Sequence, residues 1–193
     1  MMTGMEKNGD VVKLASYAPL FNRIGHSQWT PDLIWFNEES VVYTPNYYVQ
    51  KIFSDYAGSK ALQLDGQDKK LREKKLYVSA VLDDDGKIIV KVVNASEEEQ
   101  TLNLTDEKGQ VYSCDCEKVL MQASNGKAKP VVQTEAVDTN DGNKGLPGGD
   151  VATNFKMCEL RKPEATSYII SKIHLDGKVS LPPKTITVLR FEK

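Results

Sequence analysis

The spacing of apolar residues along this 193-residue chain predicts a helix and a buried strand near its start. Apolar residues between Val11 and Phe21 recur at intervals of three and four, which predicts a helix with Asp10 as its N-cap. Pro19 would end or bend that helix. The run DLIWF at residues 32–36 is almost wholly apolar, as is typical of a strand buried on both faces in a parallel sheet.

A second helix is predicted from the segment PNYYVQKIFSDYAG. Pro45 suits the first turn of a helix, and Tyr48, Ile52 and Tyr56 follow at four-residue spacing along one face. Gly58 would end the helix. Helix, buried strand, loop and helix in this order are typical of an α/β fold, but this unit is too small to bury its own apolar surface.

From about residue 74 the period of the pattern becomes two, which predicts strands. The segment KLYVSAVLDDDGKIIVKVVNAS holds two alternating runs joined by Asp84-Asp85-Gly86, a specific hairpin signal. The runs VYSCDCEKVLMQA and KPVVQTEAV are joined through Asn125-Gly126, which predicts a second hairpin.

Further strands are expected at residues 167–174 and 185–191, after a polar, glycine-rich stretch. Short strands separated by turn residues indicate a mainly β fold, an antiparallel β-sandwich of the jelly-roll kind. The change of period divides the chain at about residue 60. We therefore expect a short α/β segment over residues 1–60 and an all-β domain over residues 61–193.

Composition narrows the function classes only slightly. The chain is 40% hydrophobic and 27% charged, which is ordinary for a globular protein. A formal net charge of −2 provides no general attraction to nucleic acid or to an anionic membrane. No apolar run approaches the roughly 18 to 20 residues that cross a bilayer, and the first residues do not resemble a secretory signal. The compartment stays open.

Cysteine and histidine provide no recognisable metal or cofactor site. Cys114 and Cys116 form a lone C-x-C, and Cys158 stands apart. A metal site would need a second pair of cysteine or histidine ligands at suitable spacing, but His26 and His174 lie in separate segments. We therefore expect reduced cysteines that point to one face of a strand, and no metal ion or cofactor.

Three other motifs have simpler explanations than a functional site. The acidic runs at residues 83–85 and 97–99 fall at predicted turns, where carboxylates are common because they are solvated and cap the backbone. The glycine-rich stretch at 142–149 lacks the Gly-Lys-Ser/Thr ending of a phosphate-binding loop. Asn94 and Asn103 each begin a glycosylation pattern, which often arises by chance and matters only in a secreted eukaryotic protein.

The front of the chain resembles a known enzyme family. The segments MTGMEKNGDVVKLASYAPLFN, WTPDLIWFN and TPNYYVQKIFSDYAG closely resemble the end of the catalytic barrel in α-L-arabinofuranosidases of glycoside hydrolase family 51. The ending VSLPPKTITVLRFEK is similar to the last strand of the all-β domain that follows the barrel there. The resemblance implies that residues 1–60 are a short α/β remnant of a TIM barrel, preceding the sandwich.

The resemblance also implies an activity. These enzymes are retaining hydrolases that remove terminal arabinofuranosyl groups from hemicellulose or pectin side chains, using one glutamic acid as the proton donor and one glutamate as the nucleophile. In the family both glutamates lie upstream of the segment matched here. Glu6, Glu38 and Glu39 do not match their motifs, so the resemblance implies that this chain alone has no catalytic residues and is inactive.

Candidate substrate contacts also come from the resemblance. Residues 33–36 would be the eighth barrel strand and residues 45–56 the eighth helix. Active sites of such barrels lie at the carboxyl ends of the strands. Asn37 and the loop through Thr44 would therefore lie near the sugar pocket of the parent enzyme, and both residues are candidate substrate contacts.

Two roles remain open for the β-sandwich. It could support the barrel and help subunits to assemble, or it could be a carbohydrate-binding module. We favour the structural role, because Trp29 and Trp35 both lie before residue 60 and the sandwich lacks a tryptophan on which a sugar could stack. The implied partner is an arabinose-containing polysaccharide or oligosaccharide, and homo-oligomer formation stays open.

Overall fold

The computed structural model describes residues 1–27, 31–64, 68–106, 108–122, 132–134, 155–157 and 168–192. The chain forms two compact units. The first contains Met1–Ala15, Val49–Ala123 and Thr166–Lys193, and the second contains Ser16–Tyr48 and Ser124–Ala165. This boundary falls within helix α2, Pro45–Asp55. The division of the chain into two domains at residue 60 stays a prediction.

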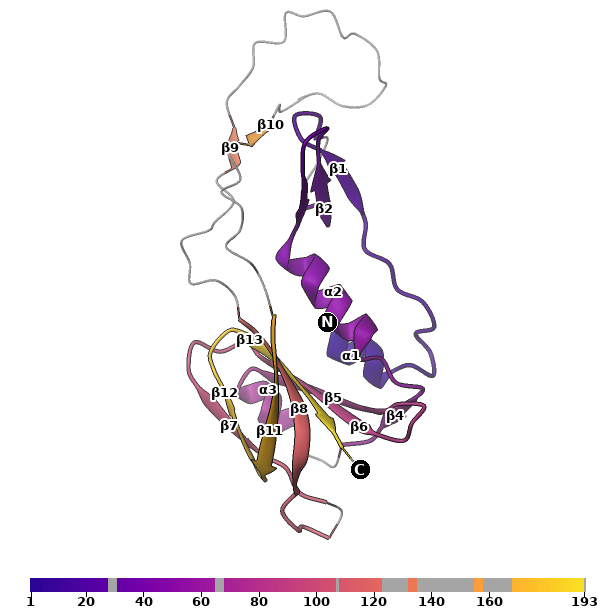
Figure 1. The fold of residues 1–193 in the computed structure, drawn as a ribbon, viewed down its shortest axis with the longest axis vertical. Helices are drawn as coiled ribbons and strands as arrows, with labels where there is room; N and C mark the ends of the chain where they lie inside the picture. The colour runs from indigo at the N-terminus through magenta and orange to yellow at the C-terminus, as the bar shows by residue number, and fades with distance from the viewer. Residues whose placement is uncertain are drawn as a thin grey trace, which may run out of the picture. The chain divides into compact units, whose positions relative to one another are not determined.

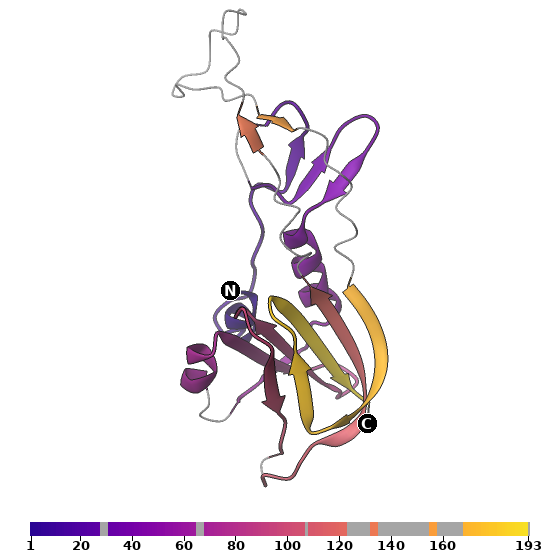
Figure 2. The same cartoon turned by 90° about the vertical axis from the view of Figure 1, so that its left-hand side faces the viewer.

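A six-stranded antiparallel sheet dominates the first unit. Its strand order is β11-β8-β13-β6-β5-β4, which Figure 1 allows the reader to follow. In Figure 2 the long strand β11, drawn in orange, curves along the edge of this sheet. The strands are β4 (Lys60–Leu62), β5 (Leu76–Leu82), β6 (Ile88–Asn94), β8 (Ser113–Gln122), β11 (Tyr168–Asp176) and β13 (Thr185–Phe191). A separate antiparallel pair consists of β7 (Gln100–Asn103) and β12 (Lys178–Leu181).

The strongest sequence signals are confirmed. Strands β5 and β6 form the hairpin predicted at Asp84-Asp85-Gly86, with Leu82 paired to Ile88 and Gly86 at a φ of 73°. Strands β11 and β13 lie where strands were expected near the end of the chain. Antiparallel sheets with few helices agree with the predicted mainly β sandwich.

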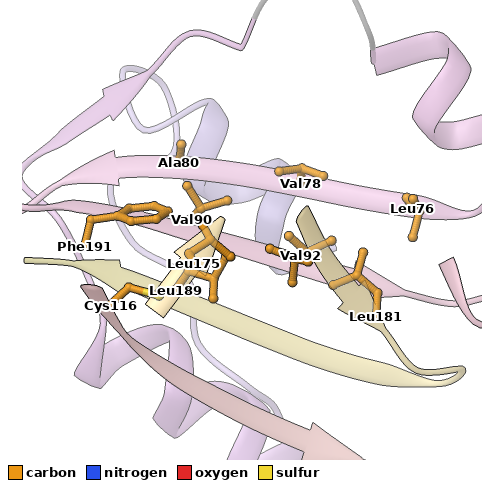
Figure 3. Packing of buried hydrophobic residues seen from close by; sticks show 11 residues of the cluster. Leu76, Val78, Ala80, Val90, Val92, Cys116, Leu175, Leu181, Leu189 and Phe191 are labelled. Atoms are coloured by element: carbon orange, nitrogen blue, oxygen red, sulfur yellow. The ribbon is translucent and has the colours of Figure 1, made fainter. Parts of the chain in front are cut away.

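One face of the six-stranded sheet packs against β7, β12 and the short helix α3 (Asp68–Glu73). Residues from this face alternate along β5 and β6 with residues that point the other way, as strand geometry requires. Figure 3 shows this core, with Val92 and Leu181 side by side. Its buried members are Leu76, Val78, Ala80, Val90, Val92, Cys116, Leu175, Val179, Leu181, Leu189 and Phe191.

The opposite face of the sheet, which we call the outer face, is also buried. Side chains of helix α1 (Met2–Lys7) and of the second half of α2 contact it. Ile52 and Phe53 of α2 are buried, as is Tyr56 directly after the helix, which confirms a helix with one apolar face. The buried side chains that the sheet presents on this face are Ser79, Val81, Ile89, Lys91, Val119, Met121 and Val188.

The second unit contains only short strands among its described residues. Strand β1 (Phe21–Arg23) pairs in parallel with β2 (Ile34–Phe36), and β2 pairs antiparallel with β3 (Val41–Tyr43). Strands β9 (Val132–Thr134) and β10 (Phe155–Met157) form another antiparallel pair. The parallel β1–β2 pair is the arrangement expected of an α/β segment.

The helix predicted from Asp10 is wrong. Helix α1 ends at Lys7, and residues 12–17 have no regular secondary structure. Val11 and Leu14 are 76% and 89% exposed. An apolar stripe stabilises a helix only when a partner surface buries it, and no described part of the chain buries this one.

The buried strand and its loop also need correction. Leu33 and Trp35 are buried, whereas Phe36 is 36% exposed, so β2 is buried on one face and not on both. The residues expected to form a loop after Asn37 contain β3, which pairs with β2. Alternation over only three residues was too short a signal to predict β3.

The second predicted hairpin is not supported. The turn at Asn125-Gly126 lies outside the described residues. The strands on either side belong to different sheets, because β8 pairs with β11 and β13 while β9 pairs with β10. Strand β8 therefore takes its partners from the end of the chain, which local turn residues cannot indicate.

Candidate functional site

The carboxyl ends of β1 and β2 form the edge where a ligand site is expected in an α/β barrel. Because the strands are parallel, their last residues, Arg23 and Phe36, are register partners. The Ile24 N–H donates to the Phe36 carbonyl at 2.8 Å, which extends the pairing beyond the strands. The Arg23 guanidinium donates to the Glu38 carboxylate. This edge therefore holds an ion pair formed by residues that follow or end the two strands.

Asn37 lies at this edge, directly after β2. Its Oδ1 accepts hydrogen bonds from the backbone N–H of Glu39 at 3.0 Å and of Ser40 at 2.7 Å. The Ser40 hydroxyl donates to the same atom at 2.9 Å. The amide oxygen of Asn37 thus organises the turn between β2 and β3. The Nδ2 atom of the same side chain makes no hydrogen bond with the described residues.

Thr44 lies at the other end of the β2–β3 hairpin. Its hydroxyl donates to the Leu33 carbonyl at 2.8 Å, and its own carbonyl accepts from the Tyr47 N–H at 3.0 Å at the start of α2. Leu33 and Asn37 are four residues apart along an extended strand, so the two candidates are separated by about 13 Å. The structure does not bring Asn37 and Thr44 together.

Aromatic side chains line the same unit. The rings of Phe21 and Phe36 meet edge to face with centroids 6.3 Å apart, and Phe21 is 60% exposed. At the start of α2, Tyr43 stacks on Tyr47 at 4.3 Å. The sequence did not single out Phe21 or Arg23, because they reach Phe36 and Glu38 only through the parallel pairing of β1 and β2.

A buried cluster of polar groups links β1 to the residues that precede β2. Asn22 and Asp32 are both buried, and the Asn22 amide donates to the Asp32 carboxylate and to the Ser27 hydroxyl at 2.6 Å. The Trp35 indole donates to the Asp32 carbonyl at 3.2 Å. Buried polar groups are usually paired in this way, so we assign this cluster a structural role.

In the first unit, pairing of β8 with β11 brings His174 to Asp115. The Nδ1 atom of His174 lies 2.6 Å from an oxygen of Asp115, and its Nε2 lies 3.4 Å from the Ser113 hydroxyl. The His174 and Asp115 side chains are 64% and 74% exposed. In water such a pair contributes little to stability. The sequence did not predict this cluster, because His174 is about 60 residues from Asp115 and Ser113 along the chain.

A hollow of about 400 Å³ lies beside the β5–β6 hairpin and is lined by residues 57–59, 83–85 and Arg190. The Lys87 backbone N–H and the Arg190 guanidinium hold the pKa of Asp83 below its ordinary value. Arg190 donates to Asp83 at 2.7 Å and lies 3.7 Å from Asp85. The acidic run therefore serves the hairpin and its ion pairs.

Metal chemistry finds no support in the part of the chain that the structure describes. No group of three or more His, Cys, Asp or Glu side chains there could hold a metal ion. Cys114 and Cys116 are free thiols on the core side of β8, and burial raises the pKa of Cys116 to about 11. The described helices include none with the length and apolar character needed to cross a membrane.

The glutamates of the front segment make their contacts in different units. Glu6 contacts the sheet of the first unit through Lys91 and Ser79, while Glu38 is paired with Arg23 in the second unit. A retaining glycosidase needs two carboxyl groups about 5 Å apart across one sugar. The contacts of Glu6 and Glu38 are instead with basic and hydroxyl groups of their own units.

Comparison with known proteins identifies relatives. A family model described as "Alpha-L-arabinofuranosidase C-terminal domain" matches residues 1–158. An extracellular exo-α-L-arabinofuranosidase of Streptomyces chartreusis is 51% identical over 61 residues, which are 32% of this chain and 7% of that protein. α-L-Arabinofuranosidase 1 of Arabidopsis thaliana is 32% identical over 142 residues, 72% of this chain and 20% of that protein. The chain thus spans a small part of both curated relatives.

Solved structures show the same fold. An arabinose-bound α-L-arabinofuranosidase, MgGH51, matches 98% of this chain and 26% of its own with a TM-score of 0.68 and 22% identity. The arabinofuranosidase of Thermotoga petrophila RKU-1 matches 99% of this chain and 36% of its own, with a TM-score of 0.64 and 13% identity. At such low identity the likeness shows a shared fold alone.

Proposed function

Because this chain belongs to the family of α-L-arabinofuranosidase C-terminal domains, we propose that it is the C-terminal portion of a retaining α-L-arabinofuranosidase. The parent enzyme removes terminal arabinofuranosyl residues from hemicellulose or pectin side chains by the two-carboxylate mechanism. The family match over residues 1–158 carries this proposal. Arabinose-containing polysaccharides or oligosaccharides are the proposed partners of the parent enzyme.

We also propose a division of the chain into two domains. Residues 1–60 are the last elements of the catalytic (β/α)8 barrel, and residues 61–193 are the sandwich. The parallel pairing of β1 with β2 supports the assignment, since parallel strands characterise such barrels. The catalytic glutamates belong to earlier strands of the parent enzyme.

This chain alone should not hydrolyse aryl α-L-arabinofuranosides. We expect a rate equal to that of buffer for residues 1–193, and hydrolysis with retained anomeric configuration for the longer protein that contains them. Release of 4-nitrophenol measures the rate, and NMR of the first product gives its configuration. An inactive longer protein, or activity of the purified chain, would contradict the proposal.

The sandwich has a structural role in this proposal. The central strands of its six-stranded sheet are covered by the core on one face and by helices α1 and α2 on the other. Among the described large hydrophobic side chains of this sheet, only those of Ile169 and Ile170 on the edge strand β11 and that of Tyr77 are left exposed. On native gels containing arabinan or arabinoxylan, the chain should migrate as it does without polysaccharide. Serum albumin is the non-binding control, and retardation of the chain alone would favour the carbohydrate-binding module.

Substrate contact by Asn37 and Thr44 stays a proposal for the parent enzyme. The position of Asn37 at the carboxyl end of β2 favours it over Thr44, which is level with Leu33. Asn37→Ala in the longer protein should raise KM for arabino-oligosaccharides more than Thr44→Ala does. Equal kinetics for the two variants would remove the distinction.

A further inference from the structure

Lys91 is a charged residue at the centre of the apolar strand β6, and its side chain is fully buried. Its ammonium group donates to one carboxylate oxygen of Glu6, which belongs to α1. The Ser79 hydroxyl donates to the other oxygen of Glu6 at 2.5 Å. The ammonium group also lies 5.4 Å from the centre of the Phe53 ring, which α2 supplies.

Ser79 and Lys91 are direct register partners on β5 and β6. They therefore point to the same face of the sheet and present two donors side by side. One carboxylate satisfies both donors, one through each oxygen. The pair forms a receptor for a single carboxylate on the outer face of the sheet.

Burial makes this receptor selective. Removing an ammonium group from water is strongly unfavourable unless an anion compensates. Burial lowers the pKa of Lys91, while the hydrogen bond that Lys91 donates to Glu6 opposes that shift. A helix that presented an apolar or cationic side chain here would leave the charge of Lys91 unpaired. A segment that covers Lys91 and Ser79 must therefore bring a carboxylate to this point.

Helix α2 covers the same face at a second polar point. Its Ile52 and Phe53 are buried, and the Tyr56 hydroxyl, just after the helix, donates to Glu117 of β8 at 2.8 Å. The apolar contacts are compatible with several arrangements of a helix on a sheet. The two polar contacts, Lys91 with Glu6 and Tyr56 with Glu117, allow few such arrangements. Each of them requires a donor to meet one particular carboxylate.

We infer that the outer face of the six-stranded sheet is a docking surface for the helical segments of this chain, and that Lys91 with Ser79 selects α1 by its Glu6 carboxylate. Residues 1–15 and 49–56 therefore complete the sandwich, although they precede residue 60. This inference goes beyond the proposed function and does not depend on the activity of the parent enzyme.

Variants of the full chain test the inference. Glu6→Gln keeps the shape of the side chain but leaves the buried ammonium group without an anion, and we expect Tm to fall by about 10 °C. Lys91→Met removes the charge and keeps an apolar side chain of similar length. The Glu6 carboxylate then keeps its Ser79 donor and some contact with water, so Tm should fall by less than half as much as in Glu6→Gln. In the double variant, Lys91→Met should restore most of the Tm lost by Glu6→Gln.

Hydrogen exchange separates selection from mere stability. In Lys91→Met, the amides of residues 2–8 should exchange at least about tenfold faster than in the original chain, because α1 has lost its specific contact. Amides of β5 and β6 should be unchanged. The matched control is Asp55→Asn, which breaks the exposed Lys51–Asp55 pair at 2.7 Å and should change Tm by no more than about 2 °C.

Three results would overturn the inference. These are an unchanged Tm in Glu6→Gln, a loss in Lys91→Met as large as that in Glu6→Gln, and unaltered exchange of residues 2–8 in Lys91→Met. If Glu6→Gln does not fold, the double variant decides. A folded double variant supports the receptor, and an unfolded one refutes it.

Discussion

The two compact units of this chain differ in how completely they bury their own strands. In the first unit, β5, β6, β8 and β13 are seven to ten residues long and are covered on both faces. In the described part of the second unit, β1, β2 and β3 have three residues each. Their exposed apolar side chains include Phe21, Val41 and Tyr43.

The difference shows which unit contains its own folding partners. Antiparallel sheets tolerate one solvated face, but parallel strands are usually covered on both faces. In the first unit, other segments of the same unit cover both faces of the central strands, and Glu6 pairs with the buried Lys91. The parallel β1–β2 pair keeps one face exposed. Regular secondary structure alone does not distinguish the two cases, whereas the pattern of burial does.

The largest expected effect contrasts two leucines. Leu189→Ala removes a fully buried side chain from the core of the first unit and should lower the free energy of unfolding by about 2 to 5 kcal/mol. Leu20→Ala, at a leucine 44% exposed in the second unit, should lower it by less than about 1 kcal/mol. Urea unfolding measures both losses, followed by far-UV circular dichroism for Leu189→Ala and by the fluorescence of Trp35 for Leu20→Ala. Equal losses would contradict the contrast between the units.

Two glycines provide the next contrast. A Cβ at Gly58 would lie 2.6 Å from the Leu82 carbonyl and from Val81, so Gly58→Ala should destabilise the first unit by about 1 to 3 kcal/mol. Gly25 has a φ of +82° but nothing within 4 Å of an added Cβ, so Gly25→Ala adds backbone strain of about 1 kcal/mol. A smaller loss at Gly58 than at Gly25 would show that the chain around Gly58 does not pack closely on β5.

Thr44→Ala tests the second unit alone. It removes the hydroxyl that donates to the Leu33 carbonyl, which should lower the free energy of unfolding of this unit by about 1 kcal/mol. The loss should be visible in the fluorescence of Trp35, which is buried in the same unit, and absent from circular dichroism of the sandwich strands. Thr101→Ala, at an exposed position of β7, is the control. A change seen equally by both probes would mean that the units unfold together.

The smallest expected effect is a gain. The hydroxyl of Thr187 is buried and has no hydrogen-bond partner among the described residues. Thr187→Val keeps the shape and removes the unsatisfied group, which should stabilise the first unit by up to about 1 kcal/mol. The urea concentration at the midpoint of unfolding, followed by circular dichroism, should rise. The midpoint followed by the fluorescence of Trp35, which reports on the second unit, should not change. A lower midpoint would imply that this hydroxyl has a partner after all.

Local sequence patterns were sufficient where a segment and its partner are neighbours along the chain. Alternation and Asp84-Asp85-Gly86 predicted the β5–β6 hairpin because its pairing closes over a few residues. The four-residue spacing of apolar side chains and the position of Pro45 predicted α2, because its whole apolar face lies within one short helix. The family resemblance likewise rested on contiguous motifs of the front segment. For such features, the residues that decide the structure are all present in one stretch.

Tertiary structure decided the features whose partners are distant. Glu6 and Lys91 are 85 residues apart, and no local pattern indicates that a lysine in an apolar strand has a carboxylate to meet. The predicted helix after Asp10 was lost for the same reason, because its apolar residues found no surface to cover. Asn37 and Thr44 were neighbours in the loop expected from the sequence, yet pairing of β3 with β2 put them at opposite ends of a hairpin. Propensity acts within a segment, whereas burial and charge pairing depend on which distant segment arrives beside it.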